Sequence, residues 1–206
     1  ALTRAIAFGR KLRAGAIGNT EWQDRVEEEL KSCSLEDLAS AVALEKLRGA
    51  QPNVKRGAGI MRVRTARPLL TEDGSDMKVF FFKKKRSDPP HCHFNLVAAH
   101  IVLEGRFRVR HYARVREEDG GVVLRPTHDR MIGPGDVTSI SDDRDNAHWH
   151  YAETDGVLLD VQQGRIDPRI PIRRRQMLDL DAATPLSDDL VWAPHLTKGR
   201  ALRQYG

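Results

Sequence analysis

The spacing of apolar residues along the chain changes near residue 59, from a helical period to a strand period. Before that point Trp22, Val26 and Leu30 recur every four residues, which places them on one face of a helix. The segment 34–37 (Ser-Leu-Glu-Asp) resembles a capping box and opens a second predicted helix. Residues 1–55 are therefore predicted to form an N-terminal helical segment, which either packs on the rest of the fold or mediates a homodimer.

From residue 59 onward, apolar and polar residues alternate. Phe107 and Val109 alternate with a series of arginines, which is typical of a strand with one buried and one solvated face. Turn signals with glycine separate such runs at residues 73–74, 104–105, 119–121, 133–135 and 154–156. This spacing favours an all-β sandwich or barrel, here over residues 56–165. The alternation fades after Gly164, so residues 166–206 are predicted to form a C-terminal extended tail.

The composition indicates one soluble domain, or one domain with a small appendage. The chain has 206 residues, of which 31% are charged, and a mean hydropathy of -0.52. No apolar run approaches the roughly 20 residues that cross a bilayer. The sequence shows no secretory signal, and its two cysteines, Cys33 and Cys92, are not predicted to pair. We therefore expect a cytoplasmic protein.

The net charge of +5 and the pI near 9.4 raise the question of nucleic-acid binding. Basic runs do occur at residues 83–86 and 173–175. Aromatic residues are only 6%, however, and no helix-turn-helix, RRM or zinc-finger spacing accompanies the basic runs. The preferred interpretation is a basic surface that attracts small anionic ligands rather than nucleic acid.

The candidate chemistry lies in two histidine-containing segments that are well separated in the chain. His91 and His93 are two residues apart, so on an extended strand their side chains project to the same side, roughly 6.5–7 Å apart along it. His148 in the second segment can complete one face around a metal ion. Imidazole is the commonest protein ligand for Zn, Fe, Cu and Ni. The sequence therefore predicts a metal site made of His91, His93 and His148.

The two segments resemble the two motifs of the cupin superfamily. His91, His93 and Gly105 have the spacing of the first motif, and residues 135–136 (Gly-Asp) followed by His148 fit the second. The resemblance covers roughly residues 59–163. It implies an all-β fold, the cupin barrel (a double-stranded β-helix or jelly roll), with the N-terminal helical segment added to it.

The sequence departs from the cupin pattern at two places. The family's Glu position falls on Ala98, which cannot bind a metal, and residues 141–146 replace the usual Pro-x-Gly turn. A site of three histidines without the Glu is similar to that of the cysteine dioxygenase-like thiol dioxygenases. This resemblance implies Fe²⁺ as the metal, with Zn²⁺, Ni²⁺ or Mn²⁺ as alternatives. It also implies a non-haem iron dioxygenase that acts on a small anionic organic substrate.

Two other functions remain open at this point. A non-redox metal-dependent cupin, an isomerase or lyase, would use the metal to polarise a carbonyl group. A non-catalytic cupin would only bind a small molecule. The three-histidine pattern favours the oxidoreductase because an anionic substrate can supply the charge that the missing Glu does not.

Further candidate residues lie close to the histidine pattern. His100 shares a strand face with Ala98, and His150 shares one with His148, so each is a catalytic base, an additional ligand or a hydrogen-bonded interior histidine. Tyr151 is a candidate donor to a metal-bound oxygen. The substrate-binding candidates are the strand cations before the first motif: Arg62, Arg64 and Lys78.

Overall fold

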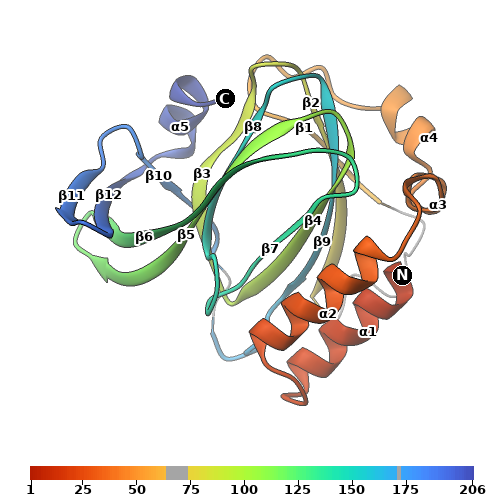
Figure 1. Cartoon of the computed structure of the whole chain (residues 1–206), viewed down its shortest axis with the longest axis horizontal. Coiled ribbons are helices and arrows are strands. Elements are labelled where there is room, and N and C mark those ends of the chain that lie inside the picture. The colour runs from red at the N-terminus through yellow and green to blue at the C-terminus, as the bar shows by residue number, and fades with distance from the viewer. Residues whose placement is uncertain (64–73, 171–172) are drawn as a thin grey trace.

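The computed structural model describes residues 1–63, 74–170 and 173–206 (Figure 1). The chain begins with four helices, α1 (Leu2–Arg13), α2 (Asn19–Lys31), α3 (Leu35–Ala41) and α4 (Leu44–Gly49). Ser34 caps α3 by accepting a hydrogen bond from the backbone N–H of Asp37, as the capping-box pattern predicts. Among the described residues, no helix is long and apolar enough to span a membrane.

Two antiparallel sheets make up the rest of the fold. The first sheet has the order β1 (Gly59–Arg62), β2 (Ser75–Phe82), β9 (Gly156–Gly164), β4 (Leu96–Glu104) and β7 (Val137–Ile140). The second sheet has the order β10 (Arg173–Leu178), β3 (Ser87–Phe94), β8 (Ala147–Ala152), β5 (Phe107–Glu118), β6 (Gly121–Ile132), β12 (Leu190–Leu196) and β11 (Thr184–Ser187).

The strand order defines a jelly roll. From β2 to β9 the chain crosses between the sheets after almost every strand, and only the β5–β6 hairpin stays within one sheet. The result is β2-β9-β4-β7 in the first sheet and β3-β8-β5-β6 in the second, the double-sheet arrangement of a jelly roll. The predicted all-β barrel with N-terminal helices is confirmed.

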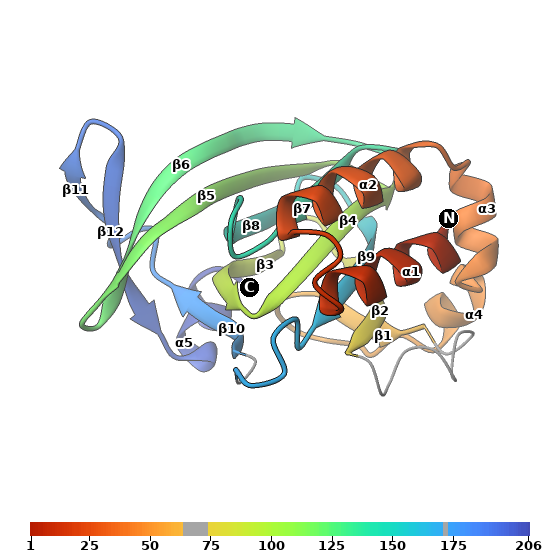
Figure 2. The same cartoon turned by 90° about the horizontal axis from the view of Figure 1, so that it is seen from below.

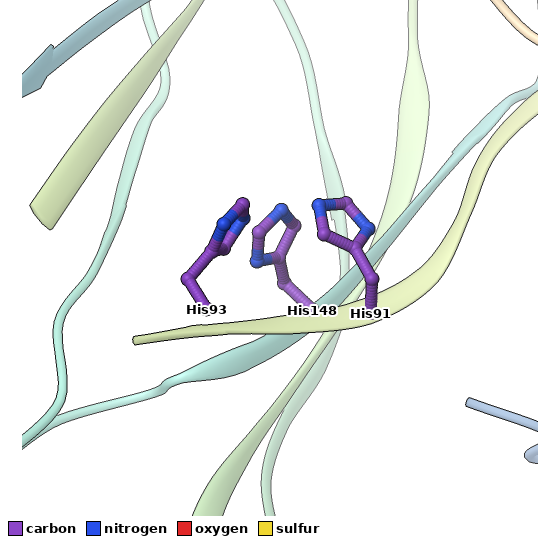
Figure 3. Close-up of side chains that lie close together, drawn as sticks. All are labelled: His91, His93 and His148. Atoms are coloured by element: carbon purple, nitrogen blue, oxygen red, sulfur yellow. The ribbon is translucent and has the colours of Figure 1, made fainter. Parts of the chain in front are cut away.

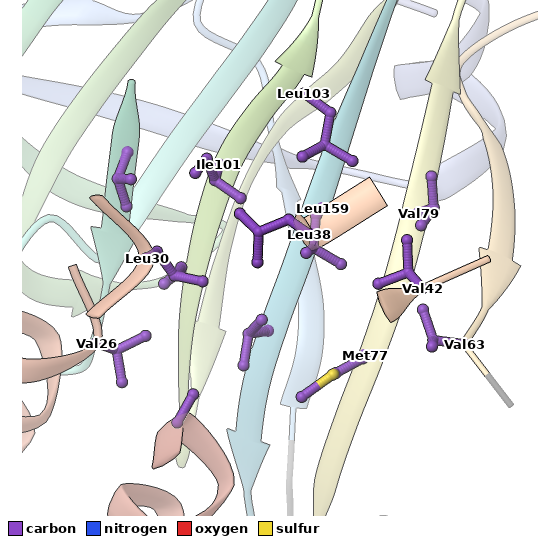
Figure 4. Packing of buried hydrophobic residues seen from close by; sticks show 14 of the residues in the cluster. Val26, Leu30, Leu38, Val42, Val63, Met77, Val79, Ile101, Leu103 and Leu159 are labelled. Carbon is purple, nitrogen blue, oxygen red and sulfur yellow. The ribbon is translucent and has the colours of Figure 1, made fainter. Parts of the chain in front are cut away.

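The first sheet is covered by helices on its outer face. The helices α1 and α2 lie along this sheet (Figure 2). Val26 and Leu30 of α2 pack in one buried cluster with Ile101 of β4 and Leu159 of β9 (Figure 4), and Trp22 belongs to the same cluster. The next residues along these strands point inward, between the sheets, because strand side chains alternate. Both faces of β4 are therefore buried, and the helices pack on the barrel, which is one of the two roles predicted for them.

The prediction of an extended C-terminal tail is wrong. Residues 166–206 contain β10, β11, β12 and the helix α5 (Lys198–Gln204). The strand β10 pairs with β3, β12 pairs with β6, and β10 and β12 pair with each other, so this segment connects the two ends of the β3-β8-β5-β6 sheet. The strand β10 gains its hydrogen bonds from β3 and β12, and the run of arginines at residues 173–175 hides the apolar alternation that would have indicated a strand.

Candidate metal centre

The three predicted metal ligands meet between the sheets. His91 and His93 project from β3, His148 projects from the neighbouring β8, and the strand register pairs His91 with His148. One ring nitrogen of each residue lies within 4.8 Å of those of the other two. The ring centroids are 4.3 Å apart for His91 and His148, 4.7 Å for His91 and His93, and 5.3 Å for His93 and His148 (Figure 3). The structure thus brings the predicted triad together.

The local sequence explains how β3 presents two rings to the interior. Residues 89–90 (Pro-Pro) have no backbone N–H to donate, and the register between β3 and β8 shifts between Asp88 and His91. After the shift, His91 and His93 share the inner face because they are two residues apart. Cys92 lies between them and packs on the opposite side, where burial raises the pKa of its thiol to about 12. Cys92 is therefore a buried thiol rather than a ligand.

All three imidazoles are buried and neutral. Burial is the main reason that the pKa of each of His91, His93 and His148 lies well below its usual range. The Nδ1–H of His91 donates to the backbone oxygen of Pro89 at 2.7 Å, which leaves Nε2 as an acceptor for a metal. The Nδ1 atoms of His93 and His148 have no hydrogen-bond partner among the described residues. Neutral imidazoles of this kind fit a divalent metal such as Fe²⁺, Zn²⁺ or Ni²⁺.

The side chain of Asn146 connects the end of β3 that carries His93 to the start of β8 by hydrogen bonds. Its side chain accepts from the backbone N–H of His93 at 3.4 Å and donates to the His93 carbonyl oxygen at 2.9 Å. It also donates to the carbonyl oxygen of Ser141 at 3.0 Å. Arg114 adds a hydrogen bond to the same His93 carbonyl at 3.2 Å. The segment 141–146, which replaces the usual cupin turn, therefore fixes the backbone of a predicted ligand.

The triad opens into a cavity of about 1000 Å³. The opposite wall is the inner face of the first sheet, where Ala98 lines the cavity and is paired across the strands with Gln162. Phe80 and Leu96 make part of the wall apolar. Ala98 supplies no ligand atom, so the protein offers three neutral nitrogens and no carboxylate at the position where the resemblance expects Glu.

A second polar cluster lies on the wall made by the first sheet. The strand register aligns Lys78, Asp160 and His100 on neighbouring strands. The Nζ of Lys78 is 3.5 Å from one carboxylate oxygen of Asp160, and the Nε2 of His100 is 3.6 Å from the other. Burial raises the pKa of Asp160 to about 6, although Lys78 opposes the shift, and burial lowers the pKa of His100 to about 3. His100 is therefore neutral, and its contact with Asp160 is not an ion pair.

The predicted substrate-binding cations fall in different environments. Lys78 lines the cavity between two carboxylates, since its Nζ is also 3.3 Å from Asp76. Arg62 lines the cavity too, but its side chain is 62% exposed and lies 3.3 Å from Asp76, so it is a rim residue. Arg64 lies outside the described residues.

The structure separates the remaining candidates, His150 and Tyr151. His150 is buried beside His100, with ring centroids 4.8 Å apart, and its Nε2 has no partner among the described residues. Tyr151 projects from the opposite face of β8 and lines a shallow outer pocket with Trp149. The prediction that Tyr151 donates to a metal-bound oxygen therefore needs correction, because strand alternation turns it away from the face that carries His148 and His150.

Several residues of the cavity were not predicted from the sequence. Asp160 and Gln162 could have been noticed in the sequence, since they are polar residues at alternate positions that follow the apolar run 157–159 of the same strand. Arg175 carries no such signal, because it lines the cavity only through the pairing of β10 with β3, and Asp88 lies on β3 itself, three residues before His91. The positioning role of Asn146 depends in the same way on the tertiary contact between β3 and β8.

Comparison with known proteins gives only distant structural likeness. No family model matches the chain, and no curated protein matches it. Among solved structures, KdgF from Halomonas sp. is 18% identical with a TM-score of 0.41, over 58% of this chain and 90% of that one. An oxalate oxidase is 19% identical with a TM-score of 0.42, over 58% and 56%. An RmlC-like cupin from Shewanella frigidimarina is 15% identical with a TM-score of 0.41, over 58% and 87%. Likeness at this level does not assign the chain to a family.

Proposed function

We propose that this protein is a metal-dependent cupin enzyme that oxidises a small anionic organic substrate with O₂, with iron as its metal. The observation that carries the proposal is the convergence of three neutral imidazoles, from His91, His93 and His148, on a cavity whose opposite wall has Ala98 in place of a carboxylate. A ferrous ion bound there would retain its full positive charge and provide open positions for substrate and O₂.

The cavity supports this proposal through its charges and its walls. A substrate thiolate or enolate would supply the negative charge that Ala98 does not. Arg62 places positive charge at the rim, which favours entry of an anion, whereas Lys78 on the wall lies between the carboxylates of Asp76 and Asp160. Phe80 and Leu96 make part of the cavity wall apolar, and an apolar wall strengthens the electrostatic attraction between a cation and the substrate.

A second candidate function, a non-redox isomerase or lyase, is favoured by the cluster of Lys78, Asp160 and His100. The raised pKa of Asp160, about 6 because of burial, suits a group that takes up and releases a proton near neutral pH. His100 lies between this carboxylate and the triad, with its ring centroid 5.3 Å from that of His148. These residues would move a proton on a substrate held at the metal.

Metal exchange distinguishes the two functions. Metal-free protein is loaded in parallel with Fe²⁺ and with redox-inert Zn²⁺, and each form is screened against small thiols, diketones and phenols with O₂ uptake and product formation as readouts. The oxygenase requires consumption of O₂ by the iron form alone. Product formation by the zinc form in the absence of O₂ would contradict the oxygenase proposal and support the isomerase or lyase.

A further inference from the structure

The C-terminal segment forms part of the wall of the cavity. It adds the cation Arg175 to Arg62 and Lys78, which the barrel strands supply. The strand β10 pairs with β3 so that Gln176 lies opposite Cys92 and Met177 lies opposite His91. The pairing places Arg175 next to the ligand-bearing end of β3, and Arg175 lines the same cavity as the three histidines. A segment that follows the jelly roll therefore forms part of the candidate active site.

Arg175 is held in place by its surroundings. One terminal nitrogen, Nη1, lies 2.6 Å from the carboxylate of Asp88, and the guanidinium lies 5.9 Å from the centre of the Phe80 ring. Among the described residues, Asp88 is the only hydrogen-bonding partner of the Arg175 side chain. The guanidinium has five N–H donors in a planar fork, so donors remain for a ligand after the bond to Asp88.

The other cations that line the cavity, Arg62, Lys78 and Lys198, are less suited to bind a second acidic group, and Lys198 is exposed to solvent at the start of α5. Lys78 lies between two carboxylates, those of Asp76 and Asp160. The side chain of Arg62 is 62% exposed, so solvent screens its charge. The side chain of Arg175 is 29% exposed and shares its charge with one carboxylate. Arg175 is therefore the cation that combines partial burial with unused donors.

We propose that Arg175 forms an anion subsite, and that the substrate is a small organic dianion with one acidic group paired to Arg175 and a second directed at the three histidines. This assignment rests on the proposed function for its metal end. Both sites line one cavity, so a single small molecule can reach both. A carboxylate accepts two parallel hydrogen bonds from a guanidinium, which sets its orientation as well as its affinity.

The test compares a dianion with a monoanion of the same chain length. Protein loaded with Co²⁺ is titrated with succinate and with butyrate, and visible absorption of the cobalt reports binding. We expect succinate to bind at least about ten-fold more tightly than butyrate, because it alone can reach Arg175. The variant Arg175→Gln should remove this preference while cobalt binding and butyrate affinity stay unchanged.

Three further variants make the test specific. Asp88→Asn should increase the preference for succinate, since it frees the charge of Arg175. The double variant Asp88→Asn/Arg175→Gln avoids leaving a buried carboxylate unpaired and should lose the preference as the single Arg175→Gln variant does. Arg108→Gln is the matched control, because Arg108 forms an exposed pair with Asp129 on β6 and does not line the cavity.

The outcomes separate this proposal from the proposed function. Equal binding of succinate and butyrate by the unaltered protein, or a preference that survives in Arg175→Gln, overturns the subsite. Failure to bind cobalt overturns the metal centre and the metal-directed end of the substrate. Calorimetry of succinate with metal-free protein then tests the anion subsite at Arg175 by itself. If Arg175→Gln abolishes the binding of succinate, the subsite is supported. If Arg175→Gln leaves that binding unchanged, the subsite is overturned.

Discussion

At the scale of single residues, replacement of the three predicted metal ligands is the most direct test of the site. Replacement of His91, His93 or His148 by Ala should sharply reduce metal content, because each ring nitrogen contributes to a cluster within 4.8 Å. Metal at ten to a thousand times its dissociation constant should stabilise the unaltered protein by roughly 1.4–4 kcal/mol and the variants by much less. Elemental analysis and thermal unfolding with and without metal measure both effects.

The control for these variants is His128→Gln, whose side chain is 51% exposed on β6 and does not line the cavity. It should retain full metal content. A triple alanine variant that still binds one metal per chain would place the metal elsewhere.

His100 should affect turnover more than metal binding. It lies on the opposite sheet from the triad, beside Asp160, and is not part of the cluster of ligand atoms. His100→Gln should therefore keep its metal and lose activity by about 10²–10⁴-fold if the ring transfers a proton. Metal content and turnover are measured on the same preparation. Loss of metal equal to that of His93→Ala would instead make His100 a fourth ligand.

At the scale of elements, Asn146 connects β3 to β8 at the end of β3 that carries His93. The variant Asn146→Ala removes the side chain that pairs with both backbone groups of His93. We expect a loss of roughly 1–3 kcal/mol in the free energy of unfolding, since these groups are buried, together with weaker metal binding. Urea unfolding and metal titration test the two effects.

The comparison variant Asn19→Ala removes an exposed hydrogen bond to Asp143 and should change neither quantity. Metal affinity that is unchanged in Asn146→Ala would show that His93 is positioned by other contacts, such as that of Arg114.

The helix α2 should contribute stability through its buried face. Leu30 is fully buried against the first sheet, so Leu30→Ala is expected to cost roughly 2–5 kcal/mol in unfolding free energy through lost contacts and the cavity left behind. Glu28 lies exposed on the same helix, and Glu28→Ala should stay within about 0.5 kcal/mol. Equal urea midpoints for the two variants would contradict the packing of α2 on the barrel.

At the scale of the whole molecule, Tyr205 connects the end of α5 to the second sheet by hydrogen bonds. Its hydroxyl donates to Asp179 at 2.9 Å, and Ser87 of β3 donates to its backbone oxygen. Burial alone would raise the pKa of Asp179, but hydrogen bonds from Tyr205 and Gln204 outweigh burial and hold the pKa below its ordinary value. A carboxyl group with a lowered pKa stabilises the fold above its unfolded pKa, and this stabilisation is lost as the pH falls through the folded value.

The prediction from this contact concerns the pH dependence of thermal unfolding. Tyr205→Phe should lower stability by about 1 kcal/mol at neutral pH. The difference from the unaltered protein should stay constant down to about pH 5 and shrink at more acidic pH, because the unfolded carboxyl titrates near about pH 3.9. A difference that does not change with pH would show that Tyr205 acts through packing alone, for instance against Trp149.

The sequence alone determined the class of fold and the triad. Alternation of apolar and polar residues reports directly which side chains share a strand face, and the two-residue spacing of His91 and His93 put both on one face. The two histidine-containing segments resemble the two cupin motifs in their spacing, and this resemblance pointed to His148. These features are local or depend on position in the chain, so they can be seen before the fold is known.

The tertiary structure decided what surrounds the triad. Arg175 reaches the cavity only because β10 joins the edge of β3, and no periodicity in the run of arginines indicates that pairing. Asp160 meets Lys78 and His100 through strand register, and its raised pKa arises from burial, which a sequence does not contain. Strand pairing between distant segments is set by the packing of the whole sandwich. The cluster of three histidines was therefore predictable, whereas the charges that would select a substrate depend on contacts that only the folded chain creates.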